Sequence, residues 1–583
     1  MHLLRFAAFA AIVVVSALTA AETVRVDRFG LHEVALTATG TYANAYVECE
    51  ATAEFVSPAG AVRAVPLFWD GGATWRFRFS PDTVGEWTWS VRSGDAGLAA
   101  ARGAFACVAS RLAGGVRPMA AAPHHFVRED GTPFWWLGDT AWALLIDIPS
   151  ENHSLATATH YLDVRAQQGF NVVHVMLLSE EGDGNSGGTP WLDLATERLN
   201  PGYWQEADRR IALANARGLT VGLALAWGVK TTREPYAWAR FPSQAARLRY
   251  ARALTARYSA DNVYFLVAGE WHGEARNRPG ATPISVLREL TQIGDAVRAA
   301  DPHGRMIGIH PMNHHGSTRE FAANTAWMSF ADYQQNYRQL HERILLSRQL
   351  ARPVVNSEYA YHLRDGDGDG KTDKENSLTP DDIRHASWDI VTAGGYFVTG
   401  FGTTYFGGHR DPGKFDVDAA KNDIWEEQLG HLRKFFNALE WWKLIPSDLL
   451  VTSAEPRGED NRVAVTRASR AMRVPTPPTT TYWAMMQPGQ LYVVYVRGIA
   501  QSVALQLHAA GGAYTAREFN PRTGAWRDLP AARFGEFFDN TQLAGLPGGE
   551  AVARARAADG LADHYRYTPP DPQDWIVVLR RAD

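Results

Sequence analysis

The sequence lacks several features that would place it in common protein classes. It has only two cysteines, so at most one internal disulfide can form. It has no block of basic residues, and its 58 basic and 63 acidic side chains leave a net charge of -5. Bulk charge therefore gives no support to a nucleic-acid-binding role. Beyond the N-terminus it has no run of about 18 apolar residues, the length that a membrane-spanning helix requires.

The composition is that of a large folded protein rich in aromatic residues. The 583 residues are 46% hydrophobic and 21% charged, values typical of globular domains. This length predicts roughly two to four domains. The chain carries 20 Trp, 20 Tyr and 25 Phe. Aromatic side chains fill cores, but they also stack on sugar rings, so their number is compatible with a carbohydrate ligand.

The N-terminal segment, residues 1–21, has the pattern of a secretory signal peptide. An apolar run that ends at Leu18 follows Arg5, and small residues come after it. We therefore expect an exported protein, periplasmic or extracellular, and no lipid anchor, because no cysteine stands at the cleavage site. In an oxidising compartment Cys49 and Cys107 either form a disulfide or remain two buried thiols, and the sequence leaves both alternatives open.

The two ends of the mature chain have the pattern of β-sheet domains. In residues 22–110, short alternating segments are separated by turns. Trp75, Phe77 and Phe79 of TWRFRF share one parity, which is typical of a strand with one buried face. In residues 446–583, strand-like runs return as QLYVVYV and DWIVVLR, with the turn signal NPRTG. We predict a β-sandwich at each end.

The middle zone, residues 121–445, alternates apolar strand candidates with amphipathic helical segments such as TATHYLDVRAQQGF. This alternation predicts a (β/α)8 TIM barrel, and so a multidomain fold in which N-terminal and C-terminal β-sandwich domains flank the barrel. The predicted strands are FWWLG (134–138), NVVHVMLL (171–178), TVGLALAW (220–227), NVYFLVAG (262–269), RMIGIH (305–310), WMSF (327–330), PVVNS (353–357) and GYFVTG (395–400).

Two of these predicted strands deliver a glutamate. Glu270 follows the fourth and Glu358 the seventh. The active site of such barrels lies at the carboxyl ends of the strands, so two carboxylates three strands apart can face each other across the mouth. Glycosidic bond cleavage needs such a pair: one group protonates the leaving oxygen, and the other, ionised, attacks or stabilises the anomeric carbon. The alternative is two ordinary charged residues that follow strands.

The neighbours of the two glutamates indicate roles. Trp271 is an apolar neighbour that would raise the pKa of Glu270 and keep it an acid. The phenol of Tyr359 would hold an ionised Glu358 in place. Further candidate sugar contacts follow other strands, and each could instead pack its loop. They are Asp139, Trp142, Trp227, His310, Tyr333, Gln335 and Tyr337, and Trp271 and Tyr359 are further candidates beside the two glutamates.

The segment HPMNHHG contains three histidines, His310, His314 and His315. It lacks a second ligand group at zinc spacing, so we favour substrate contact or loop structure over a metal site. We expect no cofactor for catalysis.

Five segments in order resemble the apiosidase-like family of glycoside hydrolases: FWWLGDTAWALL, RAQQGFNVVHVMLL, NVYFLVAGE, IGIHP and RPVVNSEY. FWDGGATWRFRFSPDTVGEWTWSV is similar to the small β-sandwich that often precedes such barrels, and REFNPRTGAW to their C-terminal sandwich, sometimes labelled collagen-binding. The resemblance implies a (β/α)8 enzyme in which Glu270 is the acid/base and Glu358 the nucleophile, as in the large clan of retaining barrel glycosidases.

The sequence departs from that pattern at two positions. The clan usually has Asn before the acid/base, where this chain has Gly269, and some family members have Asp where it has Glu270. With these departures noted, we predict a secreted glycoside hydrolase with a plant or algal polysaccharide or oligosaccharide as its partner, acting by a retaining two-carboxylate mechanism. The alternative is a catalytically silent carbohydrate- or protein-binding protein on the same scaffold.

An acidic segment, RDGDGDGKTDKEN at 364–376, has the spacing of a calcium-binding loop. Its aspartates occupy positions 1, 3, 5 and 9 of such a loop, with Gly370 at position 6, although position 12 is Asn376. Clustered carboxylates repel one another unless a cation is bound. We therefore expect a structural calcium ion; the alternative is a solvated acidic loop. The predicted ligands are Asp365, Asp367, Asp369 and Asp373.

A calcium ion in this loop would bind the folded state alone. A hundredfold excess over the dissociation constant should then raise the free energy of unfolding by roughly 2.7 kcal/mol, and chelation should lower the melting temperature. Replacing Asp367 and Asp369 together by Asn should have the same effect as chelation. The idea fails if calorimetry finds the same melting temperature with calcium and with chelator in protein that elemental analysis shows to be metal-free.

Overall fold

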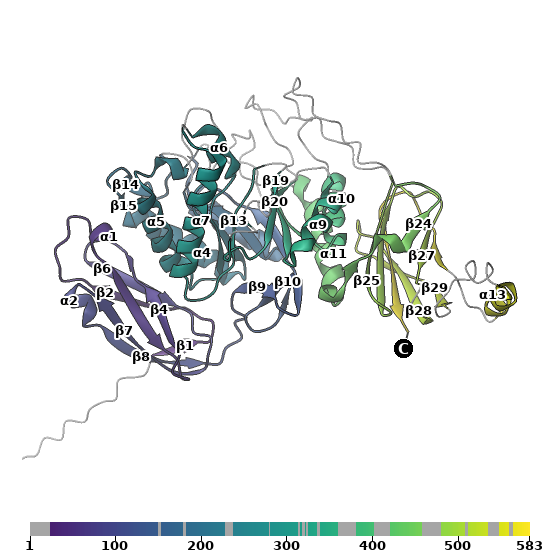
Figure 1. The fold of residues 1–583 in the computed structure, drawn as a ribbon, viewed down its shortest axis with the longest axis horizontal. Coiled ribbons are helices and arrows are strands. Elements are labelled where there is room, and N and C mark those ends of the chain that lie inside the picture. Colours follow the sequence, from purple (N-terminus) through teal and green to yellow (C-terminus); the bar gives the residue numbers. More distant parts are fainter. Residues whose placement is uncertain are drawn as a thin grey trace, which may run out of the picture.

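The structure is a computed structural model, and three parts follow one another along its longest axis in Figure 1: N-terminal sheets, a barrel and C-terminal sheets. The predicted signal peptide, Gln335, Tyr337 and the four calcium-loop aspartates lie outside the described residues. Those are residues 24–149, 153–178, 182–227, 237–278, 280–312, 315–316, 321, 325–334, 339–359, 380–400, 420–457, 480–507, 511–534, 547–558 and 564–582.

The middle part contains eight parallel strands within the described residues, arranged as a nearly closed barrel, which confirms the predicted (β/α)8 core. The sheet runs from β18 through β17, β16, β13, β12, β22 and β21 to β20. A bridge between Ile307 and Met328 joins the two ends. The strands are β12 (Leu137–Thr140), β13 (Val172–Met176), β16 (Thr220–Ala224), β17 (Val263–Leu266), β18 (Ile307–Gly308), β20 (Ala331–Gln334), β21 (Val354–Tyr359) and β22 (Tyr396–Thr399).

Helices surround these strands and begin where the sequence supplies capping residues. Ser154 and Thr282 form capping boxes, and the side chains of Asn200 and Ser243 accept hydrogen bonds from backbone amides in the first turn. The helices are α3 (Leu155–Gln167), α4 (Pro201–Ala216), α5 (Gln244–Tyr258), α6 (His272–Asn277), α7 (Pro283–Ala300), α9 (Leu340–Ser347), α10 (Pro380–Thr392) and α11 (Ala420–Asn437), with short 3-10 helices η2 (Ala237–Arg240), η3 (Arg348–Leu350), η5 (Trp441–Lys443) and η6 (Asp448–Leu450).

The sixth barrel strand lies later than predicted. The apolar run WMSF only approaches the barrel: Trp327 and Phe330 are buried, and Met328 makes the bridge to β18. The strand itself, β20, follows with the sequence ADYQ. Hydropathy missed it because its polar residues Asp332 and Gln334 are buried among other polar groups at the barrel mouth. The first strand also starts later, at Leu137.

Smaller β-elements surround the barrel. A three-stranded sheet leads into it, a hairpin precedes α4, and β19 pairs antiparallel with β20. They are β9 (Val116–Met119), β10 (Ala122–Arg128), β11 (Pro133–Phe134), β14 (Trp191–Asp193), β15 (Arg198–Leu199) and β19 (His315–Gly316).

The N-terminal part consists of a five-stranded sheet, β1-β8-β7-β3-β4, and a three-stranded sheet, β2-β6-β5. Their inner faces share one core, in which Phe55 of one sheet stacks on Phe79 of the other with ring centroids 4.1 Å apart. The elements are β1 (Arg25–Asp27), β2 (His32–Thr37), α1 (Ala45–Glu48), β3 (Ala51–Val56), β4 (Val62–Pro66), β5 (Phe68–Trp69), β6 (Thr74–Phe79), β7 (Gly85–Ser93), α2 (Ala96–Ala99) and β8 (Arg102–Val108).

The two cysteines lie in this N-terminal core. Cys49 and Cys107 are both buried and both free. The structure therefore has two buried thiols, and burial raises the pKa of the Cys107 thiol.

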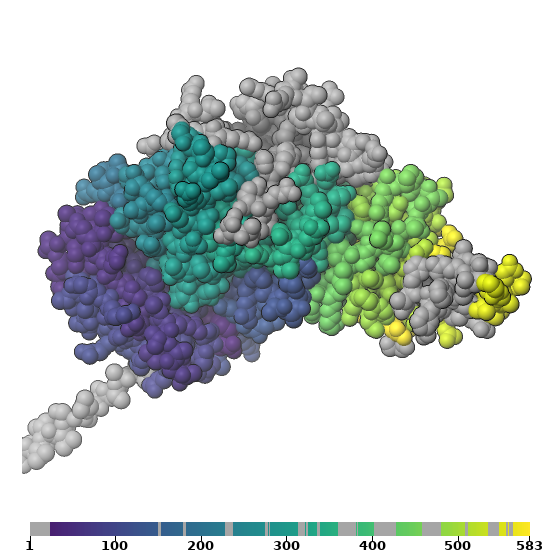
Figure 2. All heavy atoms as spheres, in the orientation of Figure 1, coloured from purple at the N-terminus to yellow at the C-terminus, as the bar shows by residue number. Residues whose placement is uncertain are grey.

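The outer face of β6 packs against the barrel through a buried cluster of charges. Arg78 donates to Asp208 of α4 at 2.6 Å, and Arg257 of α5 donates to the same carboxylate at 2.7 Å. Arg257 also reaches Asp70 at 2.9 Å, and the Phe68 ring lies beneath both guanidinium groups. Figure 2 shows the resulting close contact between the purple N-terminal part and the teal barrel.

The C-terminal part has a six-stranded sheet buried on both faces. One face packs on a three-stranded sheet, and the other packs on α10 and α11, where Trp388 stacks on Tyr495 at 5.6 Å. Burial on both faces explains why LYVVYV is a continuous apolar run. The elements are β23 (Ile445–Pro446), β24 (Val451–Ser453), β25 (Thr481–Gln487), β26 (Leu491–Arg497), β27 (Val503–Gln506), β28 (Gly512–Phe519), β29 (Trp526–Phe534), α13 (Gly549–Ala558), β30 (His564–Tyr567) and β31 (Trp575–Arg581).

The helices that the structure describes include none that is both long enough and apolar enough to span a membrane.

The charge cluster generates a stability prediction. Asp208→Asn removes the carboxylate that two buried arginines share, and the uncompensated charges should lower the free energy of unfolding by about 3 kcal/mol. The matched control is Asp163→Asn, which breaks the more exposed pair of Asp163 with Arg217. That control should change stability by less than about 1 kcal/mol. Equal effects of the two variants in denaturant unfolding would contradict the structural importance of this cluster.

Candidate active site

The carboxylate of Glu358 lies at the carboxyl end of β21 and is almost fully buried, with 2% of its surface exposed. Its Oε2 lies 3.0 Å from Nε2 of His310, which follows β18. The register of β21 against β22 shifts between Asn356 and Tyr359. Such a bulge re-aims side chains, and here it lets both Ser357 and Glu358 approach the same imidazole.

His310 is the centre of the candidate site. Its Nδ1 lies 2.7 Å from Oγ of Ser357, so both ring nitrogens have hydrogen-bond partners. Burial favours the neutral ring, but the hydrogen bond to Glu358 and the nearby carboxylates outweigh it and raise the pKa of His310. These carboxylates include that of Glu270, which places the second glutamate in the same electrostatic environment. A protonated His310 donates to both neighbours.

A buried carboxyl group extends this arrangement behind Ser357. The Ser357 hydroxyl donates to Oδ1 of Asp332, on β20, and the other oxygen of that carboxyl lies 3.9 Å from Nδ1 of His310. Burial raises the pKa of Asp332 to about 7, and the charge of His310 opposes this. A chain of carboxyl, hydroxyl, imidazole and carboxylate groups therefore runs from Asp332 through Ser357 and His310 to Glu358.

Glu270 adopts an unusual backbone conformation at the end of the fourth strand. Its φ is +47°, in the left-handed region that few residues other than glycine occupy. Its Oε1 accepts a hydrogen bond from Nε2 of Gln334, at 3.3 Å, and 8% of its surface is exposed. Strain of this kind is concentrated at functional sites, where the surrounding structure holds it in place.

Gly269 is required by a close contact with Trp227. A Cβ atom at position 269 would lie 1.7 Å from a ring carbon of Trp227, so no other residue fits. The Trp227 ring in turn stacks on His310, with centroids 4.9 Å apart and an angle of 29°. This contact explains why the chain has no asparagine before Glu270.

Aromatic residues and a second histidine line the same region. Trp142 lies 4.3 Å from Trp227 and 5.4 Å from His310, as measured between ring centroids. Below them, His174 is hydrogen-bonded to the hydroxyl of Tyr264. Burial, together with the charge of His310, lowers the pKa of His174 to about 3, so this ring is neutral.

Three residues predicted as sugar contacts face the surrounding helices instead. Asp139 is fully buried and pairs with Arg165 of α3 at 2.6 Å. The hydroxyl of Tyr333 is bonded to Ser347 of α9, and that of Tyr359 to Ser387 of α10. These predictions are wrong because alternate residues of a strand point to opposite faces, and these three lie on the outer face. Tyr359 therefore does not hold the Glu358 carboxylate.

The structure brings some predicted residues together and reveals others that the sequence did not indicate. Trp142, Trp227 and His310 meet beside Glu358. Trp271 instead packs on His272, 3.8 Å away, and on Phe321, 5.2 Å away. The residues missed are Asp332, Gln334, Ser357 and His174. The signal that could have indicated Asp332, Gln334 and Ser357 is the polar residues within the strand segments ADYQ and VVNSE.

A further buried carboxylate, Glu274, lies on α6. Burial raises its pKa to about 7, and the nearby charges of Arg278 and Arg247 oppose this. It faces these arginines and is not among the groups that act on His310.

Among the described residues, no group of three or more His, Cys, Asp or Glu side chains could hold a metal ion. The side chains of His314 and His315 are not described. Calcium binding by the acidic loop stays a prediction.

The geometry provides two buried carboxylates at the ends of the fourth and seventh strands, with the imidazole of His310 hydrogen-bonded to one of them. Aromatic rings lie beside both. A pair of carboxyl groups at the mouth of a (β/α)8 barrel is what glycosidic bond cleavage requires.

Comparison with known proteins agrees with this arrangement. The family model described as the apiosidase-like catalytic domain matches residues 121–443, and a domain of unknown function, DUF5060, matches residues 25–94. A search of curated proteins found no match. Solved structures share the fold at low identity.

A candidate glycoside hydrolase from Bacteroides vulgatus is 16% identical with a TM-score of 0.68, covering 96% of this chain and 100% of its own. A second glycoside hydrolase, also 16% identical, has a TM-score of 0.58 and covers 80% of this chain and 97% of its own. A family 5 glycoside hydrolase from B. vulgatus is 16% identical with a TM-score of 0.57, covering 80% of this chain and 93% of its own.

The apiosidase-like match spans more than half of the chain and coincides with the barrel that carries both glutamates. The protein therefore belongs to the apiosidase-like family and is a glycoside hydrolase.

Proposed function

We propose that this glycoside hydrolase is exported and cleaves a plant or algal polysaccharide with retention of configuration, using Glu358 as nucleophile and Glu270 as acid/base. The observation that carries the assignment is the buried Glu358 carboxylate bonded to His310 at the barrel mouth. Export is supported by the signal-like residues 1–21. The sheets at each end are proposed as β-sandwich domains.

In the first step the Glu358 carboxylate attacks the anomeric carbon while Glu270 donates a proton to the departing glycosidic oxygen. A covalent glycosyl-enzyme forms and the aglycone leaves. In the second step Glu270, now ionised, takes a proton from water, which attacks the same carbon and releases Glu358. Each carboxyl group thus returns to its starting protonation state.

His310 would keep the nucleophile ionised. A protonated imidazole 3.0 Å from the Glu358 oxygen stabilises the charged form of that carboxylate, and the raised pKa of His310 favours the protonated imidazole. Ser357 and Asp332 orient the ring by fixing its other nitrogen. These two are positioning residues, because they touch the imidazole and its partners and do not touch the substrate.

The aromatic rings supply the apolar side of the site. Trp227 and Trp142 lie beside His310, where a sugar ring could stack on an indole face. The family name indicates apiosyl linkages as one substrate class to include in a screen. A panel of plant and algal polysaccharides, assayed for released sugars, tests the substrate; failure of the whole panel would reject the proposed polymer class.

A catalytically silent scaffold is the less favoured alternative. Burying carboxylates costs free energy unless they are paired or used. The left-handed Glu270, beside a glycine required by Trp227, adds backbone strain that a binding surface does not need.

Glu358→Gln should abolish turnover on every substrate, because a neutral amide cannot attack the anomeric carbon. We expect a fall in kcat of at least about 1,000-fold, with no burst of product. The measurement is initial-rate and burst kinetics with an aryl glycoside of the sugar that the screen identifies. A variant retaining a tenth of the wild-type rate would reject Glu358 as nucleophile.

Glu270→Gln should slow hydrolysis of the natural glycan but spare aryl glycosides with good leaving groups, which need little protonation in the first step. Added azide should restore the second step, because it attacks without base assistance. The matched control is Glu274→Gln, four residues away, which should keep wild-type rates on both substrates. If Glu274→Gln shows the selective loss and Glu270→Gln does not, the acid has been assigned to the wrong residue.

His310→Asn should change both activity and the pH dependence of stability. Loss of the cation raises the pKa of Glu358, so the acid limb of the kcat/KM profile should move up by about one pH unit or more. The pKa of His310 is raised on folding, so its proton stabilises the wild type fully below pH 6.5. The stabilisation by this proton is lost as the pH rises through the folded-state pKa of His310. The His310→Asn variant lacks the imidazole, so its free energy of unfolding should not fall in this pH range.

The matched control is His125→Asn. His125 is a buried histidine of β10, hydrogen-bonded to the hydroxyl of Tyr396, the first residue of β22. Its folded-state pKa is lowered by burial to about 3, so it contributes no proton in this range. An unshifted acid limb in His310→Asn, measured by kcat/KM between pH 4 and 9, would mean that His310 does not control Glu358.

A further inference from the structure

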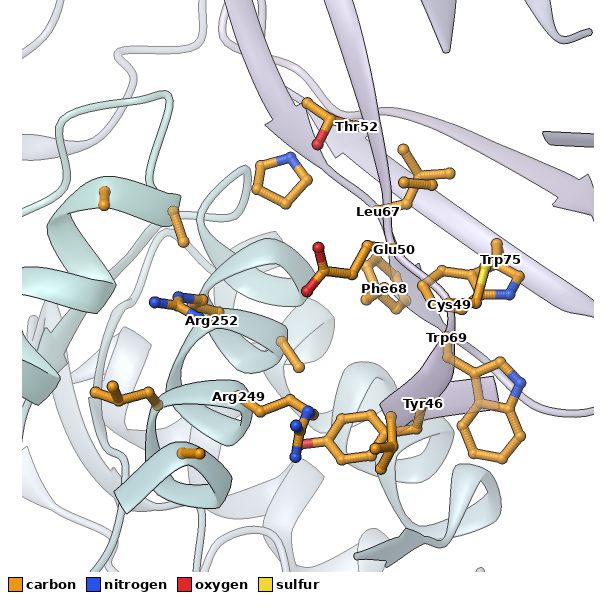
Figure 3. Close-up of a pocket in the computed structure, with 18 residues that line it drawn as sticks. Tyr46, Cys49, Glu50, Thr52, Leu67, Phe68, Trp69, Trp75, Arg249 and Arg252 are labelled. Atoms are coloured by element: carbon orange, nitrogen blue, oxygen red, sulfur yellow. The ribbon is translucent and has the colours of Figure 1, made fainter. Parts of the chain in front are cut away.

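A cavity of about 480 Å³ lies between the N-terminal sheets and the barrel, away from the catalytic residues. Figure 3 shows its two walls: α1, β3 and β5 on one side and α5 on the other. None of the residues that line it belongs to the candidate active site. Glu50 and Arg252 line the cavity and are exposed, so the cavity is open to solvent.

The α5 wall is formed by residues one helical turn apart. Ala245, Arg249 and Arg252 lie on the same side of the helix, and Ala253 of α5 and Ala300 at the end of α7 add small side chains that leave space. Arg249 is paired with Glu197.

The opposite wall is aromatic. Trp69 is half-buried, and its Nε1 is already occupied by the carbonyl of Gly72, 2.9 Å away. Phe68 and Trp75 are buried beside it. An indole with a partly exposed ring and a satisfied N–H presents a flat apolar surface, of the kind on which the C–H face of a sugar ring packs.

Two buried polar atoms on this wall have no hydrogen-bond partner among the described residues: the hydroxyl of Tyr46 and Nε1 of Trp75. The two side chains are 6% and 4% exposed. In Figure 3 Tyr46 and Arg249 point toward each other, and the Glu50 carboxylate projects into the space between the walls. Buried polar groups are nearly always satisfied, and the Tyr46 hydroxyl is the one of these two atoms that faces α5 across the cavity, so it is the atom that a group from outside the chain would satisfy.

The charged side chains that line the cavity restrict the kind of ligand that can bind there. Arg249 is neutralised by Glu197, and the lining residues Glu50 and Arg252 carry opposite charges. A strongly anionic or cationic ligand would find no excess of the complementary charge. The Tyr46 phenol can donate or accept and the Glu50 carboxylate accepts, so a ligand with groups that both donate and accept matches the two. Neutral sugar hydroxyl groups do both.

We propose that this cavity is a second, non-catalytic binding site for neutral saccharide units, which holds a polysaccharide against the side of the barrel while another part of it is cleaved. The binding itself does not depend on the roles assigned to Glu270 and Glu358. Its role in holding a substrate rests on the proposed function.

The test is affinity electrophoresis of the full chain carrying Glu358→Gln, in gels containing xyloglucan, galactomannan, arabinoxylan or laminarin, with polygalacturonate as an anionic comparison. We expect at least one neutral polymer to retard the protein. Tyr46→Phe removes the unpartnered hydroxyl but keeps the ring contact with Trp191, and should weaken binding by about threefold to tenfold. Arg252→Ala should weaken it by a similar factor.

The matched control is Arg288→Ala, which removes an exposed arginine of α7 that does not line the cavity, and it should bind like the parent. Melting temperatures of all variants establish that they are folded, and in a wild-type background the cavity variants should hydrolyse a small aryl glycoside at the normal rate.

The proposal is overturned if no neutral polymer retards the protein, if only polygalacturonate does, or if both cavity variants bind like the parent. In that last case water satisfies the two polar atoms and the catalytic site does the binding. If Glu358→Gln were still active, the role of Glu358 as nucleophile would be rejected. The comparison of gel retardation between the parent and the cavity variants would still test the second binding site.

Discussion

A buried imidazole bonded to a buried carboxylate determines how the barrel mouth is built. His310 and Glu358 are each almost inaccessible to solvent, and neither charge is stable there alone. Their pairing requires strands five and seven to end at the same level, with strand six between them supplying Asp332. A parallel barrel meets this requirement because all its carboxyl ends lie on one rim. The bulge in β21 then brings Ser357 to the same ring.

The flanking sheets support this mouth indirectly, by burying the helices behind the strands. Arg384 of α10 makes two hydrogen bonds to Asp574 in the C-terminal part, at 2.8 and 2.9 Å, and Asp389 accepts from Trp483 at 2.9 Å. The same helix contributes Ser387, which is hydrogen-bonded to Tyr359, the residue that follows Glu358. The position of Glu358 therefore depends on packing that extends beyond the barrel.

The sequence predicted the barrel and the placement of both glutamates, because apolar runs that end in a carboxylate are visible without knowledge of side-chain direction. The prediction of sugar contacts failed where the direction of a side chain decides what it contacts. Asp139, Tyr333 and Tyr359 follow the right strands but face the helices. Gln334, which the sequence did not indicate, approaches Glu270, whereas the predicted Gln335 lies outside the described residues. A register shift of one residue, such as the bulge in β21, reverses these assignments and leaves no trace in hydropathy. Asp332 was missed because its strand is too polar to resemble a buried one.

Gly269 shows how a departure from a family pattern can have a steric cause. The Trp227 ring occupies the space that a side chain at 269 would fill, and the same ring stacks on His310. An asparagine at position 269 would displace the Trp227 ring, and His310 would lose the indole on which its imidazole stacks. The hydrogen bond that such an asparagine offers a sugar hydroxyl must then be supplied by another group or be absent, while Trp227 offers an aromatic face in its place. In the proposed mechanism, recognition of the sugar beside Glu270 therefore rests on stacking where an asparagine would make a polar contact, and positions 227 and 269 are constrained to change together.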